Sequence, residues 1–153
     1  MIKFISGDIL RAPSQYIAID VATDSEEGMF TGLAMKVSSK WPDVQRHFKQ
    51  FTRGNKFQGG ELFVVSPGKN RPGIIYIAIQ PYLHNTSSPF LNGGLRKLAR
   101  YCVKHNVESV SLPRIGAGLV DVDWENETRP LLVKYFEGAK TMFYVYDDQK
   151  QKQ

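Results

Sequence analysis

Two kinds of segment alternate along this chain, and that alternation constrains the fold more than any other feature. Six short runs are rich in β-branched and aromatic residues, and we expect them to form strands at residues 2–6, 16–22, 61–67, 73–80, 109–115 and 141–147. Some, such as "GIIYIAI", are continuously apolar, which is typical of strands buried on both faces. The pattern predicts an α/β protein with three α/β/α layers around a central mixed, largely parallel sheet.

Helical patterns lie between these runs. Residues 31–39 and 42–51 predict one or two helices, and Leu91, Leu95, Leu98 and Cys102 share one face of a helix that should end near Asn106. In "DWENETRPLLVKYFEG", Pro130 predicts either a kink or a helix that begins only there, and Gly138 ends it. With 153 residues, 42% of them apolar, the chain fits one domain. We expect that domain at residues 1–147 and a polar C-terminal tail at 148–153.

Targeting signals are missing from the sequence as it stands. The opening "MIKFIS" alternates like a strand and lacks the features of a secretory leader, and the most apolar run is too short to cross a bilayer. The single cysteine, Cys102, falls within an apolar helical pattern and is interpreted as a buried thiol rather than a nucleophile. We therefore expect a cytoplasmic monomer that has no membrane partner, no metal and no cofactor.

A formal charge of +5 favours anionic partners in general. Part of the excess is local, at Arg46, Lys49, Arg53 and Lys56. A solvated basic helix face is one interpretation and a nucleic-acid-binding surface is another. The segment lacks the interleaved exposed aromatic residues expected of a stacking platform, so nucleic acid is the weaker interpretation.

Residues suited to binding an anion follow the predicted strands. Ligands of such sheets bind beyond the carboxyl ends of the strands. Gly7 and Asp8 follow the first strand, and "PRIGAGLVDVDW" follows the fifth. Gly116 and Gly118 would let consecutive backbone N–H groups close around a pyrophosphate, although an ordinary turn would use the same residues.

Several of these segments, in this order, resemble the macrodomain family, and in particular the group that contains the terminal ADP-ribose protein glycohydrolase. They are "GDIL", "GMFTGLA", "YIAIQ", "LPRIGAGL" with a following tryptophan, and the final "YVY". The likeness extends from Ile2 to about Asp147. It implies an α/β/α fold that holds ADP-ribose across the strand ends, with ADP-ribose or an ADP-ribosylated macromolecule as the partner.

The resemblance also implies roles for individual residues. Asp8 would accept a hydrogen bond from the adenine amino group beside the Ile9 backbone, unless it is only a turn or cap residue. Thr31 and Gly32 would face the phosphates and the distal ribose at a helix N-terminus, and Tyr146 would lie near the distal part of the ligand. The ligand-binding residues implied are Asp8, Ile9, Phe30, Thr31, Gly32, Leu33, Ala34, Arg114, Ile115, Gly116, Ala117, Gly118, Leu119 and Tyr146.

The chain departs from the family pattern at positions that bear on catalysis. Phe30 replaces a glycine of the distal-ribose loop, and Ile19 and Ala22 stand where histidine or asparagine is common. Gln80 and Val120 occupy the places of the lysine and aspartate that the related glycohydrolases use. An amide cannot form the imine-like adduct that an amine forms with an opened ribose, and valine cannot transfer a proton.

Asp20, Gln80 and His84 remain as polar candidates for catalysis. His84 would suit a general base because its ordinary pKa is close to neutrality. The leading interpretation is an ADP-ribose-recognition domain, either a reader or a weak hydrolase of ADP-ribosylated groups or ADP-ribose phosphates. A true ADP-ribosyl hydrolase using Asp20 or His84, and a nucleic-acid-binding module, are the alternatives.

Overall fold

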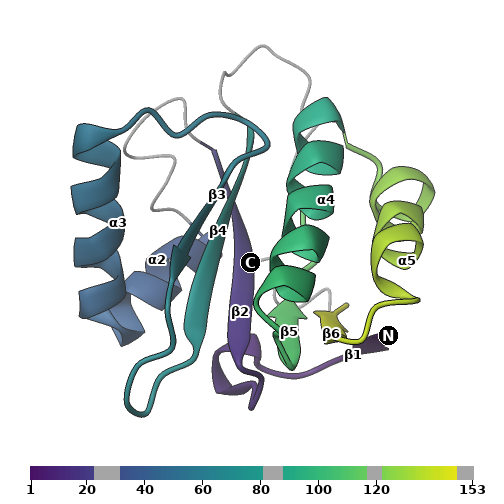
Figure 1. Ribbon diagram of the computed structural model, residues 1–153, viewed down its shortest axis with the longest axis horizontal. Coiled ribbons are helices and arrows are strands. Elements are labelled where there is room, and N and C mark those ends of the chain that lie inside the picture. The colour runs from purple at the N-terminus through teal and green to yellow at the C-terminus, as the bar shows by residue number, and fades with distance from the viewer. Residues whose placement is uncertain (23–31, 81–87, 117–121, 148–153) are drawn as a thin grey trace.

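A single mixed sheet organises the computed structural model, which describes residues 1–22, 32–80, 88–116 and 122–147. Its strand order is β1-β6-β5-β2-β4-β3 (Figure 1). The strands are β1 (Ile2–Ile5), β2 (Tyr16–Ala22), β3 (Leu62–Val65), β4 (Gly73–Gln80), β5 (Ser109–Leu112) and β6 (Met142–Tyr146). Every pairing is parallel except that of β3 with β4. The six predicted strands and the mixed, largely parallel sheet are confirmed.

Helices cover both faces of this sheet and complete the predicted three layers. In Figure 1, α2 (Gly32–Lys40) and α3 (Pro42–Gly54) lie on one side, and α4 (Ser88–Lys104) and α5 (Arg129–Phe136) lie on the other. The segment predicted as one or two helices is two, because Trp41 precedes a proline and has φ −130°, ψ 81°, outside the helical region. Helix α4 ends at Lys104, close to the predicted end near Asn106.

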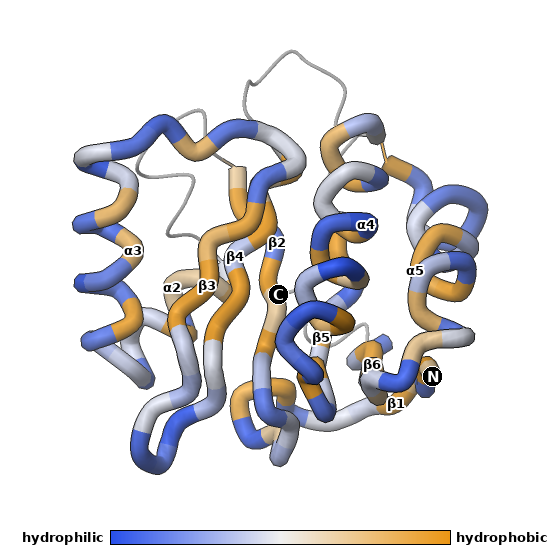
Figure 2. Tube along the Cα trace, in the orientation of Figure 1, coloured by the Kyte–Doolittle hydropathy of each residue, from blue (hydrophilic) through white to orange (hydrophobic). Residues whose placement is uncertain are grey.

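The apolar core divides into two layers, one on each face of the sheet. Along β2, Ile17 and Ile19 pack toward α2 and α3, whereas Tyr16 and Ala18 pack toward α4 and α5. This alternation is the one that strand geometry imposes on successive side chains. Figure 2 shows the result, with apolar residues along the strands and polar residues on the outer surfaces of the helices.

Two irregular helices follow strand ends, and the sequence did not predict either. The short 3₁₀ helix η1 (Ile9–Arg11) follows β1, and the π-helix η2 (Trp124–Thr128) precedes α5. Pro130 lies in the first turn of α5, which begins at Arg129 directly after η2. Helical residues therefore lie on both sides of the proline, so the helical segment does not begin only at Pro130.

Cys102 is buried, as the sequence predicted, with 2% of its surface exposed. Burial raises the pKa of its thiol to about 12, which keeps it protonated and unreactive. Within the described part of the chain, no helix has the length and apolar content needed to cross a membrane.

Two adjacent glycines in α4 give a test of this packing. A Cβ on Gly94 would lie 2.5 Å from Ile77 Cγ2 of β4, whereas one on Gly93 would meet nothing closer than 4.0 Å. Gly94→Ala should therefore lower the free energy of unfolding by about 1–3 kcal/mol, because a close-packed contact has no room for a methyl group.

Gly93→Ala is the matched control for that variant. It should raise the free energy of unfolding by about 0.5–1 kcal/mol, because alanine favours the helix and its side chain has space. Urea denaturation of both variants measures the difference. Equal stabilisation by the two substitutions would contradict the close approach of α4 to β4.

Candidate functional site

The carboxyl ends of the five parallel strands lie at one edge of the sheet, because parallel strands all run in the same direction. The chain leaves this edge after Ile5, Ala22, Gln80, Leu112 and Tyr146. The residues that the sequence singled out follow these strand ends or terminate them. Topology therefore brings together side chains that are far apart in the sequence, at the place where ligands bind in sheets of this kind.

At the β1 end, Gly7 and Asp8 make a tight turn. Gly7 has φ +134°, and a Cβ there would be in contact with Tyr146 Cε2 at 3.6 Å. Asp8 caps η1, since its Oδ1 accepts a hydrogen bond from the Leu10 N–H at 3.0 Å. The Asp8 side chain is 56% exposed, whereas Ile9 is buried. Asp8 thus caps η1 while its carboxylate still reaches solvent, and the adenine contact stays a prediction.

Tyr146 belongs to this same end of the site. Its ring is buried. Burial raises the pKa of its hydroxyl, and the negative charge of Asp8 raises that pKa further. The resemblance put Tyr146 near the distal part of the ligand and Asp8 at the adenine. Because β6 pairs directly with β1, the Tyr146 ring lies against the turn that carries Asp8, and its contact with the ligand stays a prediction.

The centre of the edge holds a contact between β2 and the loop after β5. The Gly116 N–H donates to Asp20 Oδ2 at 3.3 Å, across 96 positions of sequence. Gly116 is buried at φ +76°, and a Cβ would come within 3.2 Å of Val122 Cγ1. Glycine is required here by both conformation and space. The amide expected to face a pyrophosphate is therefore already bonded to a carboxylate.

Burial raises the pKa of Asp20 above its ordinary value of 3.8, while the Gly116 hydrogen bond acts in the opposite direction. Asp20 alternates with the apolar residues Ile19 and Val21, which pack on the other face of β2. The Asp20 side chain is half-buried, and among the described residues the Gly116 N–H is its backbone donor from another segment. Such a group can hold a proton at a pH where exposed aspartates have lost theirs.

Arg114 anchors the loop that carries Gly116. Its side chain is 9% exposed, and its Nε lies 3.0 Å from Asp147 Oδ1. The other oxygen of Asp147 lies 3.3 Å from Arg129 Nη1, so one carboxylate joins the loop after β5 to α5. The Arg114 guanidinium also lies 4.8 Å from the centre of the Trp124 ring and near Glu125. These contacts engage Arg114 inside the protein.

At the start of α2, Gly32 has φ +56°, and no atom of the described residues would lie within 4 Å of a Cβ there. Ala34 is buried against the sheet and Leu33 is half-buried. The first turn of α2 contains no acidic residue that would compete for its N–H groups. This helix start, which follows β2, is suited to an anion.

A comparison with protein families identifies the fold. The model of the Macro domain matches residues 33–130 of this chain. The chain belongs to the Macro domain family.

Relatives of this macrodomain include glycohydrolases. Over 136 residues it is 26% identical to the "DNA ADP-ribosyl glycohydrolase" of Mycobacterium tuberculosis, covering 86% of this chain but 38% of that protein. The chain thus spans well under half the length of that relative. Over 148 residues it is 27% identical to the human "ADP-ribose glycohydrolase OARD1", covering 95% of this chain and 90% of the relative.

A solved structure has the same fold over nearly its whole length. The macrodomain of Thermus aquaticus DarG superimposes with a TM-score of 0.80 at 25% identity, covering 97% of this chain and 99% of that one. The predicted three-layer architecture is confirmed by this match.

Some predicted site residues of this macrodomain lie outside the described residues. They are Phe30, Thr31, His84, Ala117, Gly118, Leu119 and Val120. Gln80 is described only as the last residue of β4, paired with Ala22. The sequence did not predict the hydrogen bond between Asp20 and Gly116 or the ion pairs of Asp147 with Arg114 and Arg129. In each case the partners are far apart along the chain, and no local pattern connects them. Within the described part, no three His, Cys, Asp or Glu side chains gather as a metal site.

Asp20 gives a test of the site through the pH dependence of stability. The pKa of Asp20 is raised in the folded state, so between pH 3.8 and that raised pKa the native protein binds more protons than the unfolded protein. Asp20 therefore lowers the free energy of unfolding progressively as the pH rises through this range. Asp20→Asn should therefore gain stability relative to wild type with increasing pH. The gain is about 1.4 kcal/mol for each pH unit by which the folded pKa exceeds the ordinary one.

Asp123→Asn is the opposite control, measured by thermal and urea unfolding between pH 3 and 8. Hydrogen bonds from Asn126 lower the pKa of Asp123, so its stabilisation is present above pH 3.8 and is lost as the pH falls through the lowered value. This variant should be less stable than wild type at neutral pH, with the difference shrinking in acid. The same trend in both variants would refute the raised pKa of Asp20.

Proposed function

We propose that this macrodomain binds ADP-ribose, free or attached to a macromolecule, across the carboxyl-terminal edge of its sheet, as a reader or a slow hydrolase. The observation that carries the proposal is the contact between Asp20 and Gly116, which fixes the glycine loop at the same edge as the Asp8 turn and the start of α2. Family membership supports it, as do relatives named for acting on ADP-ribose.

The adenine end is assigned to the turn after β1. The Asp8 carboxylate caps η1 through Oδ1, and its Oδ2 lies 3.8 Å from the exposed Arg11 Nε. The side chain is 56% exposed, so lone pairs remain to accept a hydrogen bond from the adenine amino group. The side of the Tyr146 ring lies next to Gly7 and limits how the turn can move. We assign adenine recognition to this turn on these grounds.

The pyrophosphate is assigned to the start of α2 and the loop after Gly116. Two features of the start of α2 support this: Gly32, where no described residue would crowd a Cβ, and a first turn without acidic residues. The helix dipole and free N–H groups favour negative charge there. The Gly116 amide is bonded to Asp20, so the donors we assign to the diphosphate on that side are the amides that follow Gly116.

Slow chemistry at most is proposed, because two side chains of the related glycohydrolases are replaced. By resemblance, Gln80 and Val120 stand where a lysine nucleophile and an aspartate are found, and neither can serve in those roles. Hydrolysis by different residues is the second candidate. The raised pKa of Asp20 favours it, since a protonated carboxyl at the site could donate a proton to a leaving group.

The binding proposal is tested by calorimetry with ADP-ribose and AMP. Asp8→Ala should weaken ADP-ribose binding by about 1–3 kcal/mol, because adenine polar groups lose a charged partner. Glu137→Ala is the control, because Glu137 is exposed and follows α5, and this variant should bind ADP-ribose as wild type does. If Asp8→Ala binds ADP-ribose as tightly as wild type does, the adenine is not recognised by the turn after β1.

Gly116→Glu should nearly abolish binding of ADP-ribose, since it adds bulk and negative charge beside the diphosphate. Because a Cβ at Gly116 would also crowd Val122, a melting curve must accompany the measurement. Gly138→Glu adds the same charge where a Cβ meets nothing within 4 Å and should bind normally. A folded Gly116→Glu protein with unchanged affinity would place the ligand elsewhere.

The catalytic side of the proposal is tested by release of ADP-ribose from a protein carboxylate ester. Wild type should act slowly, and Gln80→Lys combined with Val120→Asp should raise the rate by about tenfold or more, because the amine and its proton-transfer partner work as a unit. Each single variant should do little. Rapid turnover by wild type that is lost in Asp20→Asn would instead establish Asp20 as catalytic and overturn the reader interpretation.

A further inference from the structure

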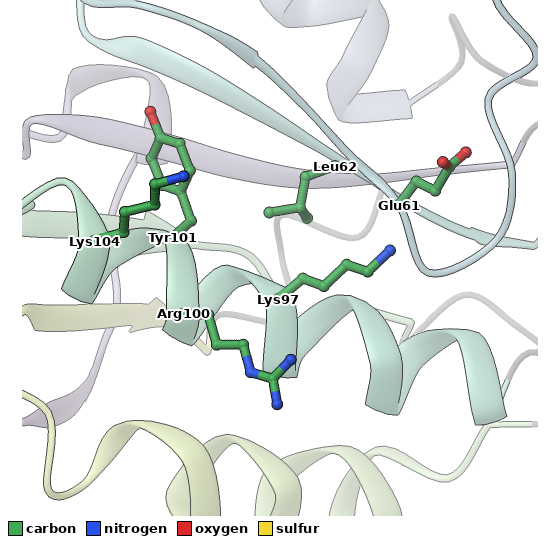
Figure 3. Close-up of a pocket in the computed structure, with 6 residues that line it drawn as sticks. All are labelled: Glu61, Leu62, Lys97, Arg100, Tyr101 and Lys104. Carbon is green, nitrogen blue, oxygen red and sulfur yellow. The ribbon is translucent and has the colours of Figure 1, made fainter.

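A second candidate site lies on the flank of α4, facing the edge strand β3. It is a hollow of about 320 Å³ lined by Glu61, Leu62, Lys97, Arg100, Tyr101 and Lys104, which we call the α4 hollow (Figure 3). One end is level with Glu61, whose carbonyl accepts the Ala78 N–H of β4. The other end is near Tyr16, at the start of β2, which touches Tyr101. The hollow therefore runs along the side of the sheet instead of across its carboxyl-terminal edge.

The charge of the α4 hollow is positive. Helix α4 contains no Asp or Glu and carries four cations, at Arg96, Lys97, Arg100 and Lys104. Among the described residues, none of these four makes an ion pair. The hollow also contains the carboxylate of Glu61, which accepts the backbone N–H of Gln58 at 2.6 Å. Three of the lining residues are cations and one is an anion, so the hollow keeps a net positive charge.

The floor of the α4 hollow is apolar and held in place. Figure 3 shows Leu62 between Lys97 on one side and Tyr101 with Lys104 on the other. The Tyr101 ring contacts Tyr16 edge-on at 6.1 Å between centroids and lies 4.3 Å from the His105 ring. Its hydroxyl is 3.4 Å from that of Tyr16. A fixed aromatic ring beside an aliphatic side chain gives a surface on which a flat ring can lie.

Helix α3 carries a second group of cations in a different setting. Arg46 and Arg53 are exposed there, whereas Phe48 is buried and stacked on Tyr76 at 4.0 Å and the half-buried Phe51 is stacked on Phe63 at 4.2 Å. The phenylalanine rings of α3 are thus stacked on other rings of the core, whereas Tyr101 of α4 lines a hollow beside the cations of its own helix.

We propose that the α4 hollow binds single-stranded nucleic acid. Lys97 and Lys104 are separated by about 10 Å along the helix, at 1.5 Å per residue, so they can contact different phosphates of one strand. A base, unpaired and unstacked, would lie on Leu62 and the Tyr101 ring between them. Cations along a backbone with an aromatic stacking surface are the combination that recognises single strands. This inference goes beyond the ADP-ribose site and does not depend on it.

The experiment measures fluorescence anisotropy of a labelled oligothymidine of about twelve nucleotides. Wild type should bind it in a salt-dependent manner, and Lys97→Gln with Lys104→Gln should weaken binding at least tenfold at low salt. Removing two phosphate contacts should also reduce the slope of log K against log salt by about 1.4, at 0.7 per contact for single strands. The matched control, Arg46→Gln with Arg53→Gln, makes the same change in net charge on α3 and should bind as wild type does.

Competitors and ADP-ribose calorimetry decide what a result means. The proposal would be overturned if the α3 control lost as much oligothymidine affinity, if a duplex of the same sequence bound equally well, or if poly-glutamate competed equally well with the oligonucleotide. Each of these outcomes would show attraction to charge without recognition of a single strand. ADP-ribose affinity should be unchanged in the Lys97→Gln, Lys104→Gln protein. A wild-type protein that binds the oligonucleotide but not ADP-ribose would refute the proposed function and leave this inference standing.

Discussion

Parallel pairing around β6, β5 and β2 is the constraint on which the rest of the molecule depends. Hydrogen bonds between these strands fix their direction, and direction alone decides that the ends of β1, β2, β4, β5 and β6 lie together. Because consecutive parallel strands need long crossovers, helices are placed on both faces and bury the sheet. A sheet covered in this way is open to ligands only at its edges, where its loops lie.

A single carboxylate connects several of these elements at that edge. Asp147, directly after β6, is paired with Arg114 after β5 and with Arg129 at the start of α5. The Arg129 guanidinium also lies 3.8 Å from the centre of the Phe4 ring in β1. Three strands and a helix therefore share one group of charged side chains, which is partly shielded from water. Such groups hold geometry well when every member is present and lose it when one is removed.

The sequence predicted features that depend on local pattern. Runs rich in β-branched and aromatic residues identified the six strands, and the spacing of Leu91, Leu95 and Leu98 identified α4. The family resemblance located the turn at Asp8 and the glycine at Gly116. What could not be predicted depends on contacts between distant segments. The Asp20–Gly116 bond, the placement of Tyr146 beside Gly7, and the wall that Leu62 supplies to the α4 hollow all join residues from different strands or helices. The sequence could have placed Lys97 and Lys104 on one face of a helix. It could not have shown that Leu62 of β3 lies opposite them.

The bond between Asp20 and Gly116 has a consequence for how this edge responds to charge. Its carboxyl group already occupies one backbone donor of the glycine loop, so it acts there as a resident anion. When ionised it repels any diphosphate that approaches the neighbouring amides, and when protonated it does not. Binding of an anion and binding of a proton must therefore favour one another by the same factor, as reciprocity between coupled sites requires. For the diphosphate site proposed above, Asp20 would therefore link the affinity for the ligand to pH.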